Sequence, residues 1–188
     1  VEGKTVIDIG ANIGDSSIYF AAKGAKKIIA LEPFPKNNNL ARKNIELNNL
    51  SDKITLLSAG CSGKKGIITL DPNQVGAGSV TDFIQDGTKI PLKTLDELIH
   101  EFNIPDDSVI KIDCEGCEVD VIKFSDKKTL QKFSQIIIEY HYGYKDLKDK
   151  LENCGFKVVT TSPLFLLNRQ SNTNMYYGYL YATNISKI

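Results

Sequence analysis

Small and acidic residues gather where the first apolar run of the sequence ends. The run over residues 6–9 contains one carboxylate, Asp8, and the segment GANIGDSS follows at residues 10–17. A carboxylate inside a buried strand is unfavourable unless a cationic or amide group pairs with it. Glycines let the backbone approach a ligand closely, and a following helix offers free amide groups. The pattern predicts a small-molecule site with these candidate residues: Asp8, Gly10, Asn12, Gly14 and Asp15.

Two later strand ends carry residues that suit a nucleoside. Glu32 ends the second apolar run about 20 residues after the glycines, where an acidic side chain can accept hydrogen bonds from both ribose hydroxyls. Ser58 and Ala59 follow the third run and are small enough for an adenine ring to lie against the backbone. Asn12 and Asp15 replace two glycines of the dinucleotide fingerprint, which disfavours a dinucleotide. The predicted cofactor residues of this part are Glu32, Pro33, Ser58 and Ala59.

Ionisable residues also occupy two later segments, IKIDCEG at residues 110–116 and IIIEYH at residues 136–141. Strand alternation places Lys111 with Asp113 on one face, and Glu139 with His141 on one face. If the two strands are neighbours, Lys111 can pair with Glu139 while Asp113 and His141 project toward a ligand. Converging charges favour a functional site. A purely structural ion pair of Lys111 with Glu139, and a purely structural role for His141, are alternatives of equal weight. The candidate catalytic residues are Lys111, Asp113, Glu115, Glu139 and His141.

Strands and helices that alternate along the chain must position these residues. Such alternation predicts right-handed crossovers and a mostly parallel sheet with helices on both faces. Thr94 and Glu97 predict a capping box, and the glycines within residues 60–78 favour hairpin or loop structure. Residues 162–174 lack helical periodicity, so the last strand is expected to return antiparallel. The expected strands are residues 6–9, 27–31, 54–57, 109–114, 135–141, 156–161 and 175–182.

The composition is that of an ordinary globular protein, with 41% hydrophobic and 24% charged residues. Lys plus Arg equals Asp plus Glu at 23 each, which disfavours a nucleic-acid partner. No apolar run approaches the roughly 20 residues of a membrane helix, and no signal peptide is recognised at the start. We therefore expect a cytoplasmic protein without membrane contact, folded as a single domain over residues 1–188.

The four cysteines form no recognisable disulfide framework, and we interpret all of them as reduced thiols. Cys114 and Cys117 have the spacing of half a zinc site, but no second cysteine pair follows. Both continue apolar faces of the expected elements, so core packing is the favoured interpretation. The cysteines are Cys61, Cys114, Cys117 and Cys154.

These motifs together resemble the FkbM family of S-adenosylmethionine-dependent methyltransferases. DIGANIG at residues 8–14, LEP at 31–33, TLDEL at 94–98, KIDCEGCE at 111–118 and EYH at 139–141 fall in the order of that family. The resemblance implies a Rossmann-like class I methyltransferase, a three-layer sandwich with a mostly parallel seven-stranded sheet and an antiparallel last strand. It also implies O-methylation of a hydroxyl on a sugar or natural-product-like small molecule or glycan.

The resemblance implies a role for each group of candidate residues. Asp8 and the glycine segment would hold the methionine end of S-adenosylmethionine, Glu32 the ribose, and Ser58 with Ala59 the adenine side. Asp113, Glu115 and His141 would face the methyl group. Cys114 and Cys117 depart from the small or aliphatic residues that are common in the family, and Ser58 replaces the usual Asn or Asp.

Methylation of an alcohol requires a base, and His141 or Asp113 is the candidate. Asp113, Glu115 and Glu139 are hard oxygen ligands, but their spacing is not diagnostic and no metal ligand is assigned. Ser79 is a candidate substrate contact. Two other functions are weighed, a non-catalytic nucleoside-binding module and, less favoured, an NAD-dependent oxidoreductase. The sequence does not indicate an oligomeric state.

Overall fold

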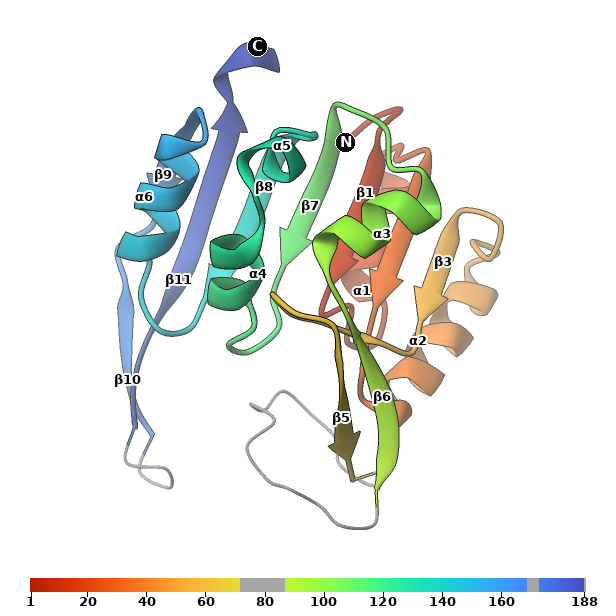
Figure 1. Cartoon of the computed structure of the whole chain (residues 1–188). Coiled ribbons are helices and arrows are strands. Elements are labelled where there is room, and N and C mark those ends of the chain that lie inside the picture. The colour runs from red at the N-terminus through yellow and green to blue at the C-terminus, as the bar shows by residue number, and fades with distance from the viewer. Residues whose placement is uncertain (72–86, 169–172, 188) are drawn as a thin grey trace.

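The computed structural model describes residues 1–71, 87–168 and 173–187, and its elements follow the expected alternation (Figure 1). The helices are α1 (Asp15–Ala22), α2 (Pro35–Leu47), α3 (Leu95–Phe102), α4 (Glu118–Phe124), α5 (Lys127–Leu130), α6 (Lys145–Asn153) and the short 3-10 helix η1 (Ile185–Lys187). The strands are β1 (Thr5–Ile9), β2 (Lys27–Leu31), β3 (Ile54–Leu57), β4 (Gly60–Cys61), β5 (Gly66–Leu70), β6 (Thr88–Lys93), β7 (Ser108–Ile112), β8 (Phe133–Tyr140), β9 (Phe156–Thr160), β10 (Leu164–Asn168) and β11 (Thr173–Asn184).

The main sheet has the order β10-β11-β8-β7-β1-β2-β3, with β9 also beside β11. The strands from β3 to β8 along this order are parallel, and β11 runs antiparallel to β8. The expected fold class and the antiparallel last strand are therefore confirmed. Within the described residues the sheet has eight strands, because β9 and β10 pair with successive parts of β11.

Helices cover the sheet on both faces (Figure 1). Apolar side chains of α1 and α2, such as Phe20 and Ile45, pack on the face that contains Val6 and Val109. Side chains of α3, α4 and α6 pack with a larger cluster on the other face. Because side chains alternate along a strand, Asp8 and Lys111 lie on the same face as Val6 and Val109.

The elements between β3 and β7 agree in part with the expectations, because β6 was not among the expected strands. Thr94 accepts a hydrogen bond from the Glu97 amide, and the Glu97 side chain accepts one from the Thr94 amide, which confirms the capping box of α3. β4, β5 and β6 form a small sheet in which β5 and β6 are antiparallel. Ser79, within residues 72–86, lies outside the described residues.

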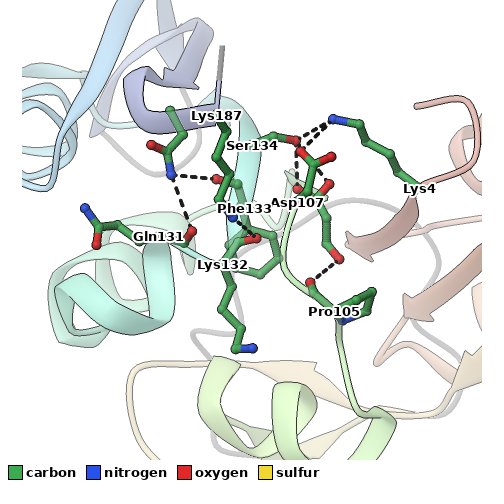
Figure 2. A network of polar contacts seen from close by, with 10 residues as sticks. Lys4, Pro105, Asp107, Gln131, Lys132, Phe133, Ser134 and Lys187 are labelled. Atoms are coloured by element: carbon green, nitrogen blue, oxygen red, sulfur yellow. Dashed lines mark hydrogen bonds and ion pairs between the residues drawn. The ribbon is translucent and has the colours of Figure 1, made fainter.

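A polar network ties the amino-terminal ends of β7 and β8 to the beginning and end of the chain (Figure 2). The Lys4 ammonium donates to Asp107 and to Ser134, at 2.9 Å each. Lys187 donates to the backbone oxygen of Lys132 at 2.8 Å. These contacts lie at the opposite end of the strands from residues 113–117, so they hold the sheet and leave the other edge to a ligand.

No helix among the described residues is both long enough and apolar enough to cross a membrane.

Candidate active site

A cavity of about 400 Å³ opens at the carboxyl ends of β1, β2 and β7. This volume is within the usual range for small-molecule sites. Seven predicted site residues line it, namely Gly10, Asn12, Glu32, Pro33, Ala59, Asp113 and Glu115. The other predicted residues are not in its wall, namely Asp8, Gly14, Asp15, Ser58, Lys111, Glu139 and His141. The wall also contains residues that the sequence did not single out for a site, including Phe34, Asn37, Ile68, Leu92, Cys114, Cys117 and Tyr142.

Gly10 follows β1 and lies against the loop after β7. Its φ of 78° is in the left-handed region, and a Cβ there would lie 1.7 Å from the backbone oxygen of Asp113. Only glycine fits such a close approach at this φ. Gly10 is one of the predicted cofactor residues and Asp113 is one of the candidate catalytic residues. The contact therefore brings the two predicted parts of the site together.

Asp8 lies beneath this loop and is completely buried. Its Oδ2 accepts hydrogen bonds from the Ser16 and Ser17 hydroxyls at 2.7 and 2.5 Å, which fastens the first turn of α1 to β1. Its Oδ1 lies 3.3 Å from the Lys111 Nζ but has no partner in hydrogen-bond geometry. Asp8 therefore contacts the residues that shape the cavity, and its side chain does not line the cavity itself.

Lys111 contacts residues from both predicted parts of the site. Its ammonium donates to the Gly10 carbonyl at 2.8 Å and lies 3.3 Å from both Asp8 Oδ1 and Asp113 Oδ2. Burial disfavours the charged amine, but the two carboxylates outweigh that effect and raise the pKa of Lys111. The predicted pairing of Lys111 with Glu139 is wrong, because the register places Lys111 beside Asp8 on β1 and beside Ile137, not Glu139, on β8.

Glu32 is the acidic residue at the end of β2, and it is nearly fully buried. Its Oε2 accepts the Asn12 amide and its Oε1 accepts the Phe34 amide, at 2.9 Å each. Burial raises the pKa of Glu32 to about 7, although the two amides act in the opposite direction. The Asn37 side chain also hydrogen-bonds to this carboxylate. A carboxylate has about four lone-pair sites, so it retains acceptor capacity for a ligand in the cavity.

His141 follows β8 and lies between two carboxylates. Nδ1 is 3.3 Å from Glu118 Oε1, and Nε2 is 3.4 Å from Glu115 Oε2. Burial favours the neutral ring, but both carboxylates oppose it and raise the pKa of His141 to about 10. Glu118 is completely buried and also accepts the His141 and Gly116 amides. The motif KIDCEGCE contains Glu118, yet the sequence did not identify it as the residue that orients the histidine.

Cys114 and Cys117 form a disulfide in the wall of the cavity, so the prediction of reduced thiols is wrong for this pair. Both residues lie in the turn between β7 and α4, where Glu115 and Gly116 have positive φ angles of 57° and 124°. The turn brings the two Cα atoms to 5.5 Å, a distance that suits a disulfide. The other two cysteines, Cys61 and Cys154, are free, as predicted, and both are buried.

Removing this disulfide is expected to lower the free energy of unfolding by about 2 kcal/mol, because a closed loop of four residues restricts the unfolded chain only modestly. The variant is Cys114→Ser with Cys117→Ser, compared with wild type by urea unfolding with and without a phosphine reductant. Reductant should destabilise the wild type by the same amount and leave the variant unchanged. Thiol titration of the denatured wild type should find two thiols before reduction, and finding four would contradict the disulfide.

Comparison with known proteins places this chain in a family. Residues 8–158 match the family described as the methyltransferase FkbM domain. Hexuronic acid methyltransferase AglP of Haloferax volcanii is 29% identical over 150 residues, which cover 79% of this chain and 60% of that protein. The chain therefore spans less than two thirds of the length of this relative.

Solved structures of methyltransferases share the fold. Methyltransferase FkbM from Methylobacillus flagellatus KT superposes with a TM-score of 0.61 at 17% identity, over 96% of this chain and 43% of that one. TrmK of M. capricolum, solved with S-adenosylhomocysteine, gives a TM-score of 0.54 at 16% identity, over 97% of this chain and 62% of that one. The fold is that of a class I methyltransferase, and the chain belongs to the FkbM methyltransferase domain family.

Proposed function

We propose that this chain transfers a methyl group from S-adenosylmethionine to a hydroxyl of a sugar or natural-product-like acceptor. Membership of a methyltransferase family supports the reaction class. The observation that carries the proposal is the cavity at the carboxyl edge of the sheet, in which the Glu32 carboxylate retains acceptor capacity. The name of the Haloferax relative, a hexuronic acid methyltransferase, favours a sugar as the acceptor.

The cavity residues fit the parts of the cofactor. Glu32 would accept hydrogen bonds from the two ribose hydroxyls, and Ala59 with Gly60 would lie against the adenine. Gly10, which lies against Asp113, and Asn12 also line the wall, and the methionine end would lie beside Gly10. Asp8 and Lys111 would act as positioning residues, because they hold the Gly10 loop and the first turn of α1 from below.

Asp113 is the proposed acceptor of the hydroxyl proton. When bound, S-adenosylmethionine supplies a strongly electrophilic methyl group, so the protein needs to align the acceptor and remove its proton. Asp113 lines the cavity and its side chain is 32% exposed, whereas His141 is 5% exposed with a carboxylate at each ring nitrogen. The geometry therefore favours Asp113 over His141, and a positioned base typically contributes about 10² to 10⁴ in rate.

The test is calorimetric titration with S-adenosylmethionine, S-adenosylhomocysteine and NAD, followed by methyl transfer from labelled cofactor to a panel of sugars and glycans. Binding of the first two ligands and transfer to a hydroxyl would support the proposal. Binding of NAD alone would favour an oxidoreductase. Cofactor binding without transfer to any acceptor would favour a non-catalytic binding module.

The affinity for S-adenosylhomocysteine is expected to fall as the pH falls through 7, the pKa to which burial raises Glu32. Ribose hydroxyls donate to the ionised carboxylate, so binding competes with protonation of Glu32. The sign follows from linkage, because the free protein binds a proton at Glu32 more readily than the complex does. The affinity therefore drops roughly 30-fold from about pH 8 to about pH 5.5.

The control variants for this pH dependence are Glu32→Gln and Glu46→Gln. Glu32→Gln should bind weakly with a flat profile over this pH range. Glu46 is an exposed residue of α2, and its replacement should leave the wild-type profile unchanged. A Glu32→Gln variant that retains the wild-type pH dependence would refute the assignment of Glu32 to the ribose.

A further inference from the structure

Two carboxylates and one imidazole converge beside the cavity. Asp113 follows the end of β7, Glu139 lies near the end of β8, and His141 follows β8. One ligand atom from each of these three residues lies within 4.8 Å of the other two. The sheet register explains the approach, because Ile112 pairs with Ile138 and the next residues along the two strands are Asp113 and Glu139.

The imidazole of His141 is held as the imidazoles of metal ligands commonly are. Glu118 faces Nδ1 from a completely buried position, and the same carboxylate accepts the His141 backbone amide at 3.1 Å. A carboxylate behind one ring nitrogen fixes the ring and leaves the other nitrogen to face a bound cation. That nitrogen, Nε2, lies 3.4 Å from Glu115 Oε2 in this structure. Glu118 is not a member of the converging group, so this support is a separate observation.

The charges around the group leave an excess of negative charge. Lys111 is the cation beside it and already lies between Asp8 and Asp113, whereas His141 must be neutral to act as a ligand and would release its proton when a metal binds. The carboxylates in and around this group are Asp8 of β1, Asp113, Glu115, Glu118 of α4 and Glu139.

We propose that Asp113, Glu139 and His141 bind one divalent cation of the Mn²⁺ type. Two carboxylates and one imidazole form a mixed oxygen and nitrogen donor set without thiolate, which suits Mn²⁺ better than a soft metal. Three protein ligands leave coordination positions for water or for an acceptor hydroxyl. A cation here would lower the pKa of a coordinated hydroxyl next to Asp113, and this use of the site rests on the proposed function.

The experiment titrates the whole chain with Mn²⁺ alone and follows free Mn²⁺ by electron paramagnetic resonance. One Mn²⁺ per chain is expected. Glu139→Gln and His141→Gln should each weaken binding at least tenfold, and Glu118→Gln about 10- to 100-fold through the orientation of the ring. Glu46→Gln is the matched control and should bind as wild type. Circular dichroism and urea unfolding verify that each variant is folded.

The same preparation is titrated with S-adenosylhomocysteine, so that the cation site and the proposed function are judged separately. Wild type that binds S-adenosylhomocysteine but no Mn²⁺ would overturn the cation site and leave the proposed function standing. Mn²⁺ bound equally by wild type and the folded Glu139→Gln and His141→Gln variants would also overturn it. Mn²⁺ binding that these variants lose supports the site, whether or not S-adenosylhomocysteine binds.

Discussion

Gly10→Ala is expected to lower the free energy of unfolding by at least about 3 kcal/mol and to weaken binding of S-adenosylhomocysteine at least tenfold. About 1–2 kcal/mol comes from the left-handed φ of 78°, which a residue with a Cβ adopts at a cost. A further 1–3 kcal/mol, roughly, comes from overpacking, since the Cβ would lie 1.7 Å from the Asp113 oxygen and backbone must move. The movement separates two walls of the cavity, so affinity falls together with stability.

Gly3→Ala is the matched control for this prediction. Gly3 also has a left-handed φ, 69°, but nothing lies within 4 Å of the position of its Cβ. It should therefore lose about 1–2 kcal/mol through φ alone and bind S-adenosylhomocysteine as wild type does. Urea unfolding and calorimetry of both variants separate the effect of φ from the effect of the contact. Equal losses of stability in the two variants would contradict the role given to the close approach.

The sequence was sufficient to predict most of the fold because the determinants are local. Apolar runs of strand length and the Thr94 capping box lie within a few residues of the structure that they specify. The antiparallel last strand also followed, since a connection without helical periodicity does not form a parallel crossover. β10 was missed, because it forms by pairing with the first part of β11 and has no separate signal in that connection.

Predictions about the site failed where they depended on which segments become neighbours. Alternation correctly placed Lys111 and Asp113 on one face, but it does not specify whether β1 or β8 supplies the partner of Lys111. The disulfide was missed for a related reason. Cys114 and Cys117 were assigned to the faces of a strand and a helix, whereas both lie in the turn between them. The positive φ angles at Glu115 and Gly116 that bring the cysteines together are not evident from their spacing.

Lys111→Met is expected to lower the free energy of unfolding by about 3–5 kcal/mol, because it leaves the completely buried Asp8 without its cation. The Ser16 and Ser17 hydroxyls remain bonded to Oδ2, but Oδ1 would have no charge partner. Methionine has a similar length, so the loss of packing is small compared with the loss of charge. Urea unfolding of the variant measures this cost directly.

The same substitution should cost much less when Asp8 is neutral. In an Asp8→Asn background, Lys111→Met removes mainly the hydrogen bond to the Gly10 carbonyl and should cost about 1–2 kcal/mol. The difference between the two backgrounds is the coupling between Asp8 and Lys111. If Lys111→Met costs the same in both, Asp8 does not depend on Lys111, and its proposed role in holding the Gly10 loop fails. If the coupling is present, the mutual stabilisation of the two charges explains why two ionisable residues lie beneath a cavity whose wall contains neither of them.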